Sequence, residues 1–231
     1  MIPIEKNKEY IMEITAVADD GNGIGRIDGY AVFVPNTVTG DIIRVLIVKV
    51  KASYGYGKLI EIIKSSVHRT VPKCDKCIRC GGCSFMHIDY SYQLEIKKSF
   101  IINNIKKIAG ISDFEFEDMY GMDIPYEYRN KMIFPVDSAA DGAVFGFYAK
   151  NSHRLVPLDN CVIGNVISSE IASFVTGFIN KEDISVYNEG THKGLVRRIF
   201  IRMAESGEIM VVIVINGKTF PKSDLLTDSL K

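Results

Sequence analysis

Alternating apolar and polar positions in the first quarter of the chain predict short β-strands. The segments EYIMEITAVA, YAVFVPNTV and DIIRVLIVKVKA alternate or run apolar, and the turn signals DDGNG, IDGY and VTGD separate them. Several short strands between Tyr10 and Ile63 predict a small closed or nearly closed β-barrel, because closure hides the edges of a sheet.

Farther along the chain, the hydrophobic pattern predicts helices and strands in turn. Residues 90–109 carry the clearest helical pattern, and Gly110 predicts its end. The apolar stripe of this helix consists of Leu94, Ile101, Ile105 and Ile108. Strands are expected at YRNKMIFPV and GAVFGFYAK, a helix within VIGNVISSEIASFVTGFINK, and a hairpin at GLVRRIFIRM and GEIMVVIVI. The pattern therefore predicts an α+β, mainly β fold, with an N-terminal barrel followed by a mixed, β-rich domain.

Length and composition favour an ordinary globular protein. The 231 residues suffice for one large domain or two modest ones with a real core. No apolar run reaches membrane-spanning length, and the N-terminus MIPIEKNKEY lacks the apolar core of a secretory signal. We therefore expect a cytoplasmic location and no membrane partner. Clustered cysteines in that compartment favour a metal over a disulfide.

The net charge of zero hides a strong segregation of charge. From Arg44 to Lys107 there are thirteen Lys and Arg against four Asp and Glu, whereas residues 111–127 hold six acids and no Lys or Arg. A basic half beside an acidic connector predicts a phosphate-binding surface on one part of the fold, although solvated charged faces explain the counts equally well.

Gly21, Gly23 and Gly25 have the spacing of a nucleotide-binding loop. Such a loop needs a helix after it, so that backbone N–H groups and the helix N-terminus face the ligand. The residues that follow, RIDGYAVFVP, are strand-like. The glycines are therefore interpreted as β-turn or bulge positions.

The cysteines point to a metal centre. Four of the five fall within ten residues, and the fifth is Cys161. The segment CDKCIRCGGC is polar and glycine-rich, unlike a stretch of buried structural thiols. Zinc ribbons place their Cys-x2-Cys knuckles well apart, whereas close cysteines with one distant partner are typical of cubane iron–sulfur clusters. A 4Fe–4S cluster is favoured over zinc, and its ligand set either includes Cys77, as in bacterial ferredoxins, or omits it.

The segment from Cys74 to His87, CDKCIRCGGCSFMH, closely resembles the iron–sulfur loop of the RumA/TrmA-type RNA (uracil-5-)-methyltransferases. Residues 8–63, with GNGIGRIDGYAVFVPNTVTGD, are similar to the TRAM domain, a small RNA-binding β-barrel. YRNKMIFPV and GFYAKNSHRLVPLDNC resemble strands of the central domain in the same family. The resemblance implies that the cluster ligands are Cys74, Cys80, Cys83 and Cys161, and that Cys77 is not a ligand.

The resemblance also implies what the chain lacks. In this family the cysteine nucleophile, the carboxylate base and the S-adenosylmethionine pocket lie in a C-terminal Rossmann-like domain. The chain would comprise a TRAM barrel (1–66) and an iron–sulfur central domain (67–231), with the catalytic domain absent. Helix 90–109 would pack with that missing domain, or else form a homodimer of the fragment. No catalytic residue is expected here, and S-adenosylmethionine is expected only in the full-length protein.

The expected partner is structured RNA. The resemblance implies 23S ribosomal RNA, although the sequence leaves the choice between ribosomal and transfer RNA open. The predicted RNA-binding residues are Lys49, Lys51, Lys58, Arg129 and Lys131, with Arg197, Arg198 and Arg202 as weaker candidates. Aromatic residues on which bases would stack are Tyr30, Phe33, Tyr54 and Tyr56. Two alternatives remain: a stand-alone RNA-binding iron–sulfur module without catalytic activity, and a ferredoxin-type electron carrier, which the β-rich domains disfavour.

Overall fold

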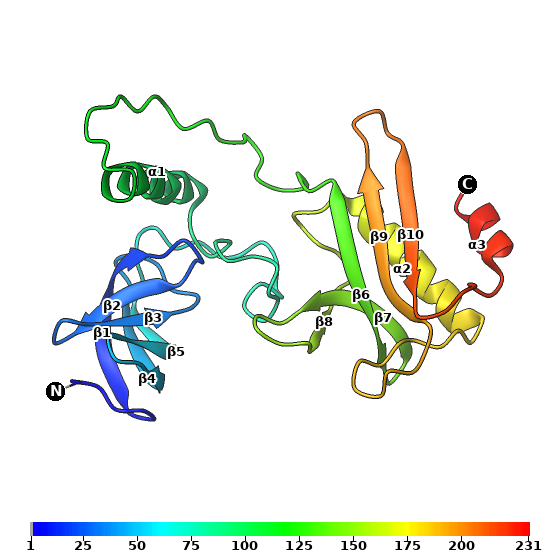
Figure 1. Cartoon of the computed structure of the whole chain (residues 1–231), viewed down its shortest axis with the longest axis horizontal. Coiled ribbons are helices and arrows are strands. Elements are labelled where there is room, and N and C mark those ends of the chain that lie inside the picture. The colour runs from blue at the N-terminus through cyan, green and yellow to red at the C-terminus, as the bar shows by residue number, and fades with distance from the viewer. Residues whose placement is uncertain (1) are drawn as a thin grey trace. The chain divides into compact units, whose positions relative to one another are not determined.

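The computed structural model describes residues 2–231, which fold as two compact units (Figure 1). The first unit contains the chain up to Asp75 together with Cys83–Asp123, and the second contains Lys76–Gly82 and Ile124–Lys231. The domain boundary expected at residue 66 stays a prediction. In the part of the chain that is described, no helix is long and apolar enough to cross a membrane.

The first unit is built on a closed five-stranded barrel, as the sequence predicts. Its strands are β1 (Glu9–Val17), β2 (Gly23–Ile27), β3 (Tyr30–Val34), β4 (Ile42–Val50) and β5 (Tyr54–Lys64), joined in the order β1-β2-β3-β5-β4. All neighbours are antiparallel except β3 and β5, which are parallel. Every second side chain points inward, so the core holds the buried residues Ile4, Met12, Ile14, Val32, Val34, Ile43, Val45 and Ile47.

The glycines of the DGNGIGRIDG segment are turn and strand residues, and no helix follows them. Gly21 has a φ of +82°, and β2 begins at Gly23. A Cβ atom on Gly23 would lie 2.0 Å from Oγ1 of Thr37, and one on Gly25 would lie 2.6 Å from the carbonyl oxygen of Glu13. These glycines therefore permit close packing of the barrel, and the turn conformation of Gly21 confirms the expected β-turn.

Helix α1 (Tyr90–Lys107) begins at Asp89, whose side chain accepts hydrogen bonds from the N–H groups of Ser91 and Tyr92. The face of α1 that packs is the line through Tyr92, Ile96 and Phe100, against Val17, Val38 and Ile88. The predicted stripe is less covered, because Ile101 is 41% exposed and Ile108 81% exposed.

The second unit is a five-stranded sheet in the order β10-β9-β6-β7-β8. The strands are β6 (Lys131–Ala139), β7 (Gly142–Tyr148), β8 (Leu155–Pro157), β9 (Val196–Met203) and β10 (Ile209–Ile215). Helix α2 (Val166–Lys181) packs against this sheet, chiefly on β7, and a short helix α3 (Ser223–Ser229) follows β10. The β9–β10 hairpin and the helix expected after residue 161 are both confirmed.

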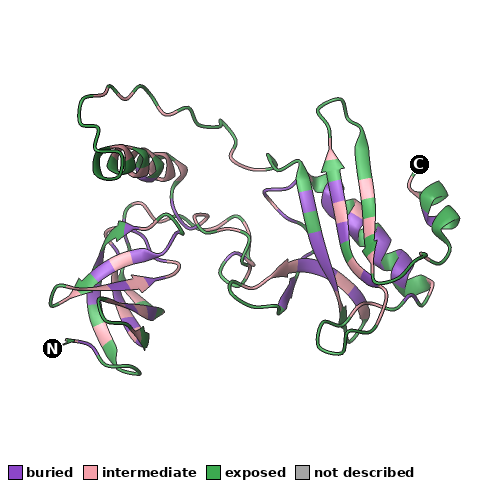
Figure 2. Cartoon of the chain, in the orientation of Figure 1, coloured by how far each residue is buried: buried purple, intermediate pink, exposed green. Residues whose placement is uncertain are grey.

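Buried and exposed positions alternate along β6 and β9 (Figure 2). On β6 the buried residues Met132 and Phe134 are paired with Ile201 and Ile199 of β9. The residues between them, including Ile133 and Phe200, are on the opposite face of the sheet and are less buried. This opposite face, called the open face below, carries Lys131, Arg198 and Arg202.

Candidate nucleic-acid interface and cysteine loop

The outward surface of the barrel over β2, β3, β5 and β4 brings together the predicted basic and aromatic residues. Strand register places Ile24, Phe33, Tyr56 and Lys49 side by side in one row across the four strands. In the neighbouring row, Arg26 of β2 pairs with Ala31, which pairs with Tyr54. We call this surface the barrel face.

Three rings form a cluster on the barrel face. The ring centroids of Phe33 and Tyr54 are 5.6 Å apart, those of Phe33 and Tyr56 5.9 Å, and those of Tyr54 and Tyr56 5.6 Å. The hydrogen bond with Tyr54 is the main reason that the pKa of Tyr56 lies above its ordinary value. Tyr30, also a candidate, is outside the cluster: it packs against the barrel core, and its hydroxyl donates to the carbonyl oxygen of Lys51 at 2.6 Å.

The three predicted barrel lysines are exposed around the rings. Lys49 pairs with Tyr56, Lys58 lies two residues after Tyr56 on β5, and Lys51 follows β4. None of them forms an ion pair with any residue in the described range 2–231. Arg26 joins them on the barrel face, although the sequence reasoning missed it, because only the strand register shows which way its side chain points.

In the second unit, Lys131 lies on the open face of the sheet directly opposite Arg202 of β9. Arg198 pairs with Pro135 on the same face, four positions farther along the register. Like charges placed directly opposite each other repel, and within the described residues neither Lys131 nor Arg202 has an ion-pair partner. Arg202 thus gains support as a phosphate-binding candidate.

A cavity of about 440 Å³ adjoins this pair of basic residues. Its lining is formed by Asn130, Arg202, Met203, Ala204, Glu208, Ile209 and Met210. Arg129 lies just before β6, exposed, and its Nε donates to the carbonyl oxygen of Lys131 at 3.2 Å. Arg197 instead stacks on Tyr187, with its guanidinium carbon 4.4 Å from the ring centroid.

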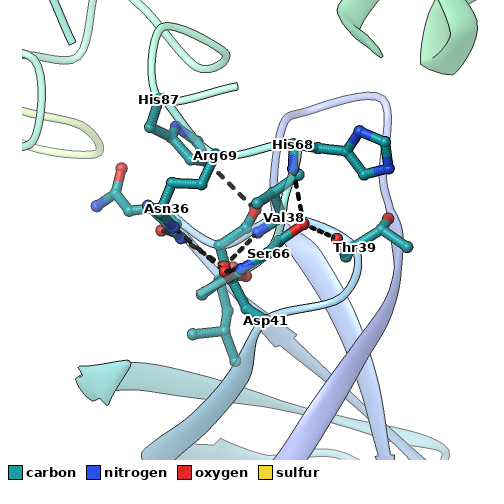
Figure 3. A network of polar contacts seen from close by, with 10 residues as sticks. Asn36, Val38, Thr39, Asp41, Ser66, His68, Arg69 and His87 are labelled. Atoms are coloured by element: carbon teal, nitrogen blue, oxygen red, sulfur yellow. Dashed lines mark hydrogen bonds and ion pairs between the residues drawn. The ribbon is translucent and has the colours of Figure 1, made fainter. Parts of the chain in front are cut away.

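A buried ion pair joins the barrel to the chain that enters the cysteine loop, Cys74–Cys83 (Figure 3). Asp41 is fully buried, and its carboxylate accepts hydrogen bonds from Arg69, from the N–H of Ser66 and from the N–H of Val38. Burial alone would raise the pKa of Asp41, but these hydrogen bonds outweigh it and hold the pKa below its ordinary value. Arg69 also donates to the carbonyl oxygen of Asn36 at 3.0 Å.

The two ends of the cysteine loop are joined beside this ion pair. Arg69 forms a β-bridge with Ile88, and the N–H of Thr70 donates to the carbonyl oxygen of His87 at 3.0 Å. Burial lowers the pKa of His87, and its Nε2 lies 3.2 Å from the carbonyl oxygen of Thr37. Because a carbonyl only accepts, Nε2 carries the hydrogen. His87 and the PNTVTGD segment therefore fasten the loop ends to the barrel.

All five cysteines are free thiols in the structure. Cys77 and Cys161 are buried, and Cys74, Cys80 and Cys83 are partly exposed. The N–H of Gly82 lies 3.4 Å from Sγ of Cys80. A Cβ on Gly81 would lie 2.7 Å from the carbonyl oxygen of Tyr148, so this position requires glycine. An N–H donor beside a cysteine sulfur suits a thiolate that binds metal, because such bonds tune iron–sulfur clusters.

The donor chemistry of the cysteine loop therefore fits a thiolate-bound metal. Within residues 2–231, the structure gathers no three His, Cys, Asp or Glu side chains into a ready metal-binding group. The predicted ligand set, Cys74, Cys80, Cys83 and Cys161, stays a prediction.

Residues 4–60 match the family model of the TRAM domain. The match covers most of the barrel, from Ile4 in its core to β5. The chain is also similar along its whole length to several bacterial proteins named uncharacterized RNA methyltransferases. The one from Clostridium acetobutylicum is 39% identical over 230 residues, 98% of this chain and 50% of its own length. The one from Caldanaerobacter subterraneus is 38% identical over 232 residues, 100% of this chain and 51% of its own length.

Among solved structures, the chain is similar to the tRNA (uracil-54, C5)-methyltransferase of Pyrococcus abyssi, crystallised in complex with S-adenosyl-L-homocysteine. The TM-score is 0.70 at 26% identity, over 93% of this chain and 48% of that one. The chain thus spans about half the length of the curated relatives that it matches.

Proposed function

We propose that this chain contributes RNA recognition to an S-adenosylmethionine-dependent RNA (uracil-5-)-methyltransferase of the cytoplasm. The observation that carries the proposal is similarity along 98–100% of the chain to proteins named RNA methyltransferases. The likeness to a tRNA uracil methyltransferase narrows the proposed target atom to C5 of a uracil. S-adenosylmethionine would supply the methyl group, and we assign no catalytic residue to this chain.

The proposed RNA contacts are made by two sets of exposed cations. On the barrel face they are Lys49, Lys51 and Lys58, and on the second unit they are Arg129 and Lys131. Each lysine presents a point charge that pairs with phosphate, so the binding is expected to weaken steeply as salt rises. Neither set reads base identity by itself, because phosphate contacts position a nucleic acid and do not specify its sequence.

A 4Fe–4S cluster held by Cys74, Cys80, Cys83 and Cys161 is part of the proposal. Its support is the thiol chemistry of the loop and the N–H of Gly82 beside the Cys80 sulfur. Metal–thiolate bonds supply binding energy that stabilises the chain segments they join. We propose this architectural role for the cluster and derive no redox step from it.

The proposal leaves two classes of RNA to be distinguished by experiment. The sequence resemblance implies 23S ribosomal RNA, whereas the solved structure is of an enzyme named for tRNA. Both classes offer structured RNA with uridines in loops, which suits a protein that binds by shape and charge. The two are distinguished by measuring binding to each.

The test is fluorescence anisotropy with a labelled tRNA transcript and a labelled 23S rRNA fragment, at several salt concentrations. We expect weak, salt-dependent binding to folded RNA, with a preference that identifies the RNA class. A chain that binds neither RNA at low salt would overturn the proposal. Incubation with radiolabelled S-adenosylmethionine should transfer no methyl group, and methyl transfer by this chain alone would contradict the absence of a catalytic residue.

A further inference from the structure

The barrel directs three of its aromatic side chains away from its own core. On β5, Tyr54 and Tyr56 alternate with the buried glycines Gly55 and Gly57. A Cβ on Gly57 would lie 2.2 Å from Cγ2 of Val45, so the inner face of β5 has no room for a side chain at this position. The tyrosines therefore occupy the outer surface, where they add nothing to the buried core.

Phe33 extends this aromatic surface onto the neighbouring strand. It lies between Val32 and Val34, whose side chains fill the core, and so it points outward beside Tyr56. The three rings remain only partly buried, although they lie within 6 Å of one another. A cluster of this kind offers flat apolar surface to a ligand with a flat apolar face.

Positive charge surrounds the three rings. Arg26 lies on the β2 side of the cluster, Lys49 lies on the β4 side, and Lys58 follows Tyr56 by two residues on β5. Arg26 donates to the carbonyl oxygen of Gly29, which leaves its charge without a carboxylate partner among residues 2–231. Against these three cations, Asp20 contributes negative charge near Tyr56. The ligand should therefore combine planar rings with several negative charges.

We propose that Phe33, Tyr54 and Tyr56 form a stacking platform for unpaired bases of single-stranded RNA, whose phosphates contact Arg26, Lys49 and Lys58. The inference rests on the proposed function and makes it more specific. A duplex cannot use such a platform, because its base faces are already stacked on one another, whereas splayed-out bases of loops can. The barrel face would thus select RNA that has unpaired nucleotides.

The chain contains no tryptophan, so a single Tyr56→Trp substitution gives a specific fluorescent reporter on the platform. Titration with short single-stranded oligouridine and oligoadenosine should quench this fluorescence, because a base stacked on the indole quenches it. A duplex RNA of the same length should leave it unchanged. Equal quenching by both would overturn the preference for unpaired bases.

Variants of Tyr56 and Lys49 separate base stacking from phosphate binding. Tyr56→Phe should keep the affinity for single-stranded RNA, whereas Tyr56→Leu, which stays apolar, should lose about tenfold. The loss should be the same at every salt concentration, because stacking releases no counterions, and Lys49→Gln should instead flatten the salt slope. The matched control is Tyr120→Ala, which removes a tyrosine that is 90% exposed, and it should bind as the unmodified chain does.

The outcomes keep the inference and the proposed function apart. If Tyr56→Leu binds as tightly as the unmodified chain while Lys49→Gln weakens binding, the platform is wrong and RNA recognition by charge stands. If no RNA binds the unmodified chain at low salt, the proposed function fails, and the inference fails with it. Thermal unfolding of each variant tests whether the barrel is intact. If Tyr56→Leu is less stable, Tyr56→Trp still reports on the site.

Discussion

At the scale of single residues, the most specific sequence motifs serve the architecture of the barrel. The PNTVTGD segment supplies Asp41 and the carbonyl oxygens of Asn36 and Thr37, which receive Arg69 and His87. Motif residues suggest function when they are seen in sequence alone. Here they hold the chain that enters and leaves the cysteine loop, so their contribution to any metal or RNA site is to position it.

We predict that Asp41→Asn destabilises the first unit by about 3 kcal/mol, because it leaves the Arg69 guanidinium largely buried without its counter-charge. Chemical denaturation followed by circular dichroism measures the change. The control is Glu61→Gln, which breaks the exposed pair with Arg44 and should cost less than about 1 kcal/mol. Equal effects of the two substitutions would contradict the structural role given to Asp41.

The lowered pKa of Asp41 predicts that part of the free energy of unfolding is lost in acid. The folded pKa of Asp41 lies below its ordinary value of 3.8, so its stabilising effect is complete above pH 3.8. The effect is lost as the pH falls through the lower folded pKa. The difference in unfolding free energy between the unmodified chain and Asp41→Asn should therefore shrink below pH 3.8. A difference that grows on acidification would contradict a lowered pKa of Asp41 in the folded chain.

The cysteines give a second prediction at the residue scale. Anaerobically purified protein should be brown and contain about four irons and four sulfides per chain. Serine in place of Cys74, Cys80, Cys83 or Cys161 should bleach the colour, whereas Cys77→Ser should keep it. Loss of the cluster in Cys77→Ser, with retention in the Cys161 variant, would show that Cys77 is a ligand and Cys161 is not.

At the scale of elements, sequence periodicity identified the strands and helices better than it identified their contacts. Alternation located the barrel strands and β9 because each has one face toward a core. In α1 the hydrophobic pattern predicts a stripe that includes Leu94 and Ile108, although a second apolar line runs through Tyr92, Ile96 and Phe100. The structure buries the other line, at Ile96, because its aromatic neighbours Tyr92 and Phe100 reach the barrel. Nothing local in the sequence ranks the two lines.

Strand register was the second limit on what the sequence predicted. Composition placed lysines and tyrosines near the barrel, but only the pairing of β2, β3, β5 and β4 puts Arg26 and Lys49 on one surface with the rings. A slip of one residue would reverse which side chains face outward, and β4 itself carries register shifts against β5. The sequence therefore shows which residue types are near the barrel, whereas only the tertiary structure shows that they share the barrel face.

For α1 we predict that Ile96→Ala lowers the free energy of unfolding by about 2 kcal/mol or more, since it opens a cavity in the small cluster beneath the helix. Replacing Ile101 and Ile105 by Lys should leave stability nearly unchanged. If the chain forms a homodimer through this uncovered face, the double substitution should yield monomers in sedimentation. Unfolding caused by the lysines in a chain that is already monomeric would show that the face belongs to its own core.

At the scale of the whole molecule, a net charge of zero coexists with a surplus of nine positive charges between Arg44 and Lys107. Acids elsewhere, above all in residues 111–127, balance that surplus. At moderate ionic strength, salt largely screens the interaction between exposed charges that are more than roughly 10 Å apart. A polyanion near the barrel therefore responds to the local charge and hardly to the net charge of the chain. Neutral proteins can therefore bind RNA, provided that the positive charges share one surface.

This reasoning predicts that position, rather than net charge, determines RNA affinity. The triple variant with Glu at Lys49, Lys51 and Lys58 should bind structured RNA more weakly and lower the slope of log affinity against log salt by about 0.7 for each phosphate that is no longer neutralised. A matched variant with Glu at the exposed lysines Lys181, Lys193 and Lys218 changes the net charge by the same amount in the second unit. It should keep the slope of the unmodified chain in anisotropy titrations. If both variants lower the slope equally, the barrel face is not the RNA site, and binding follows total charge alone.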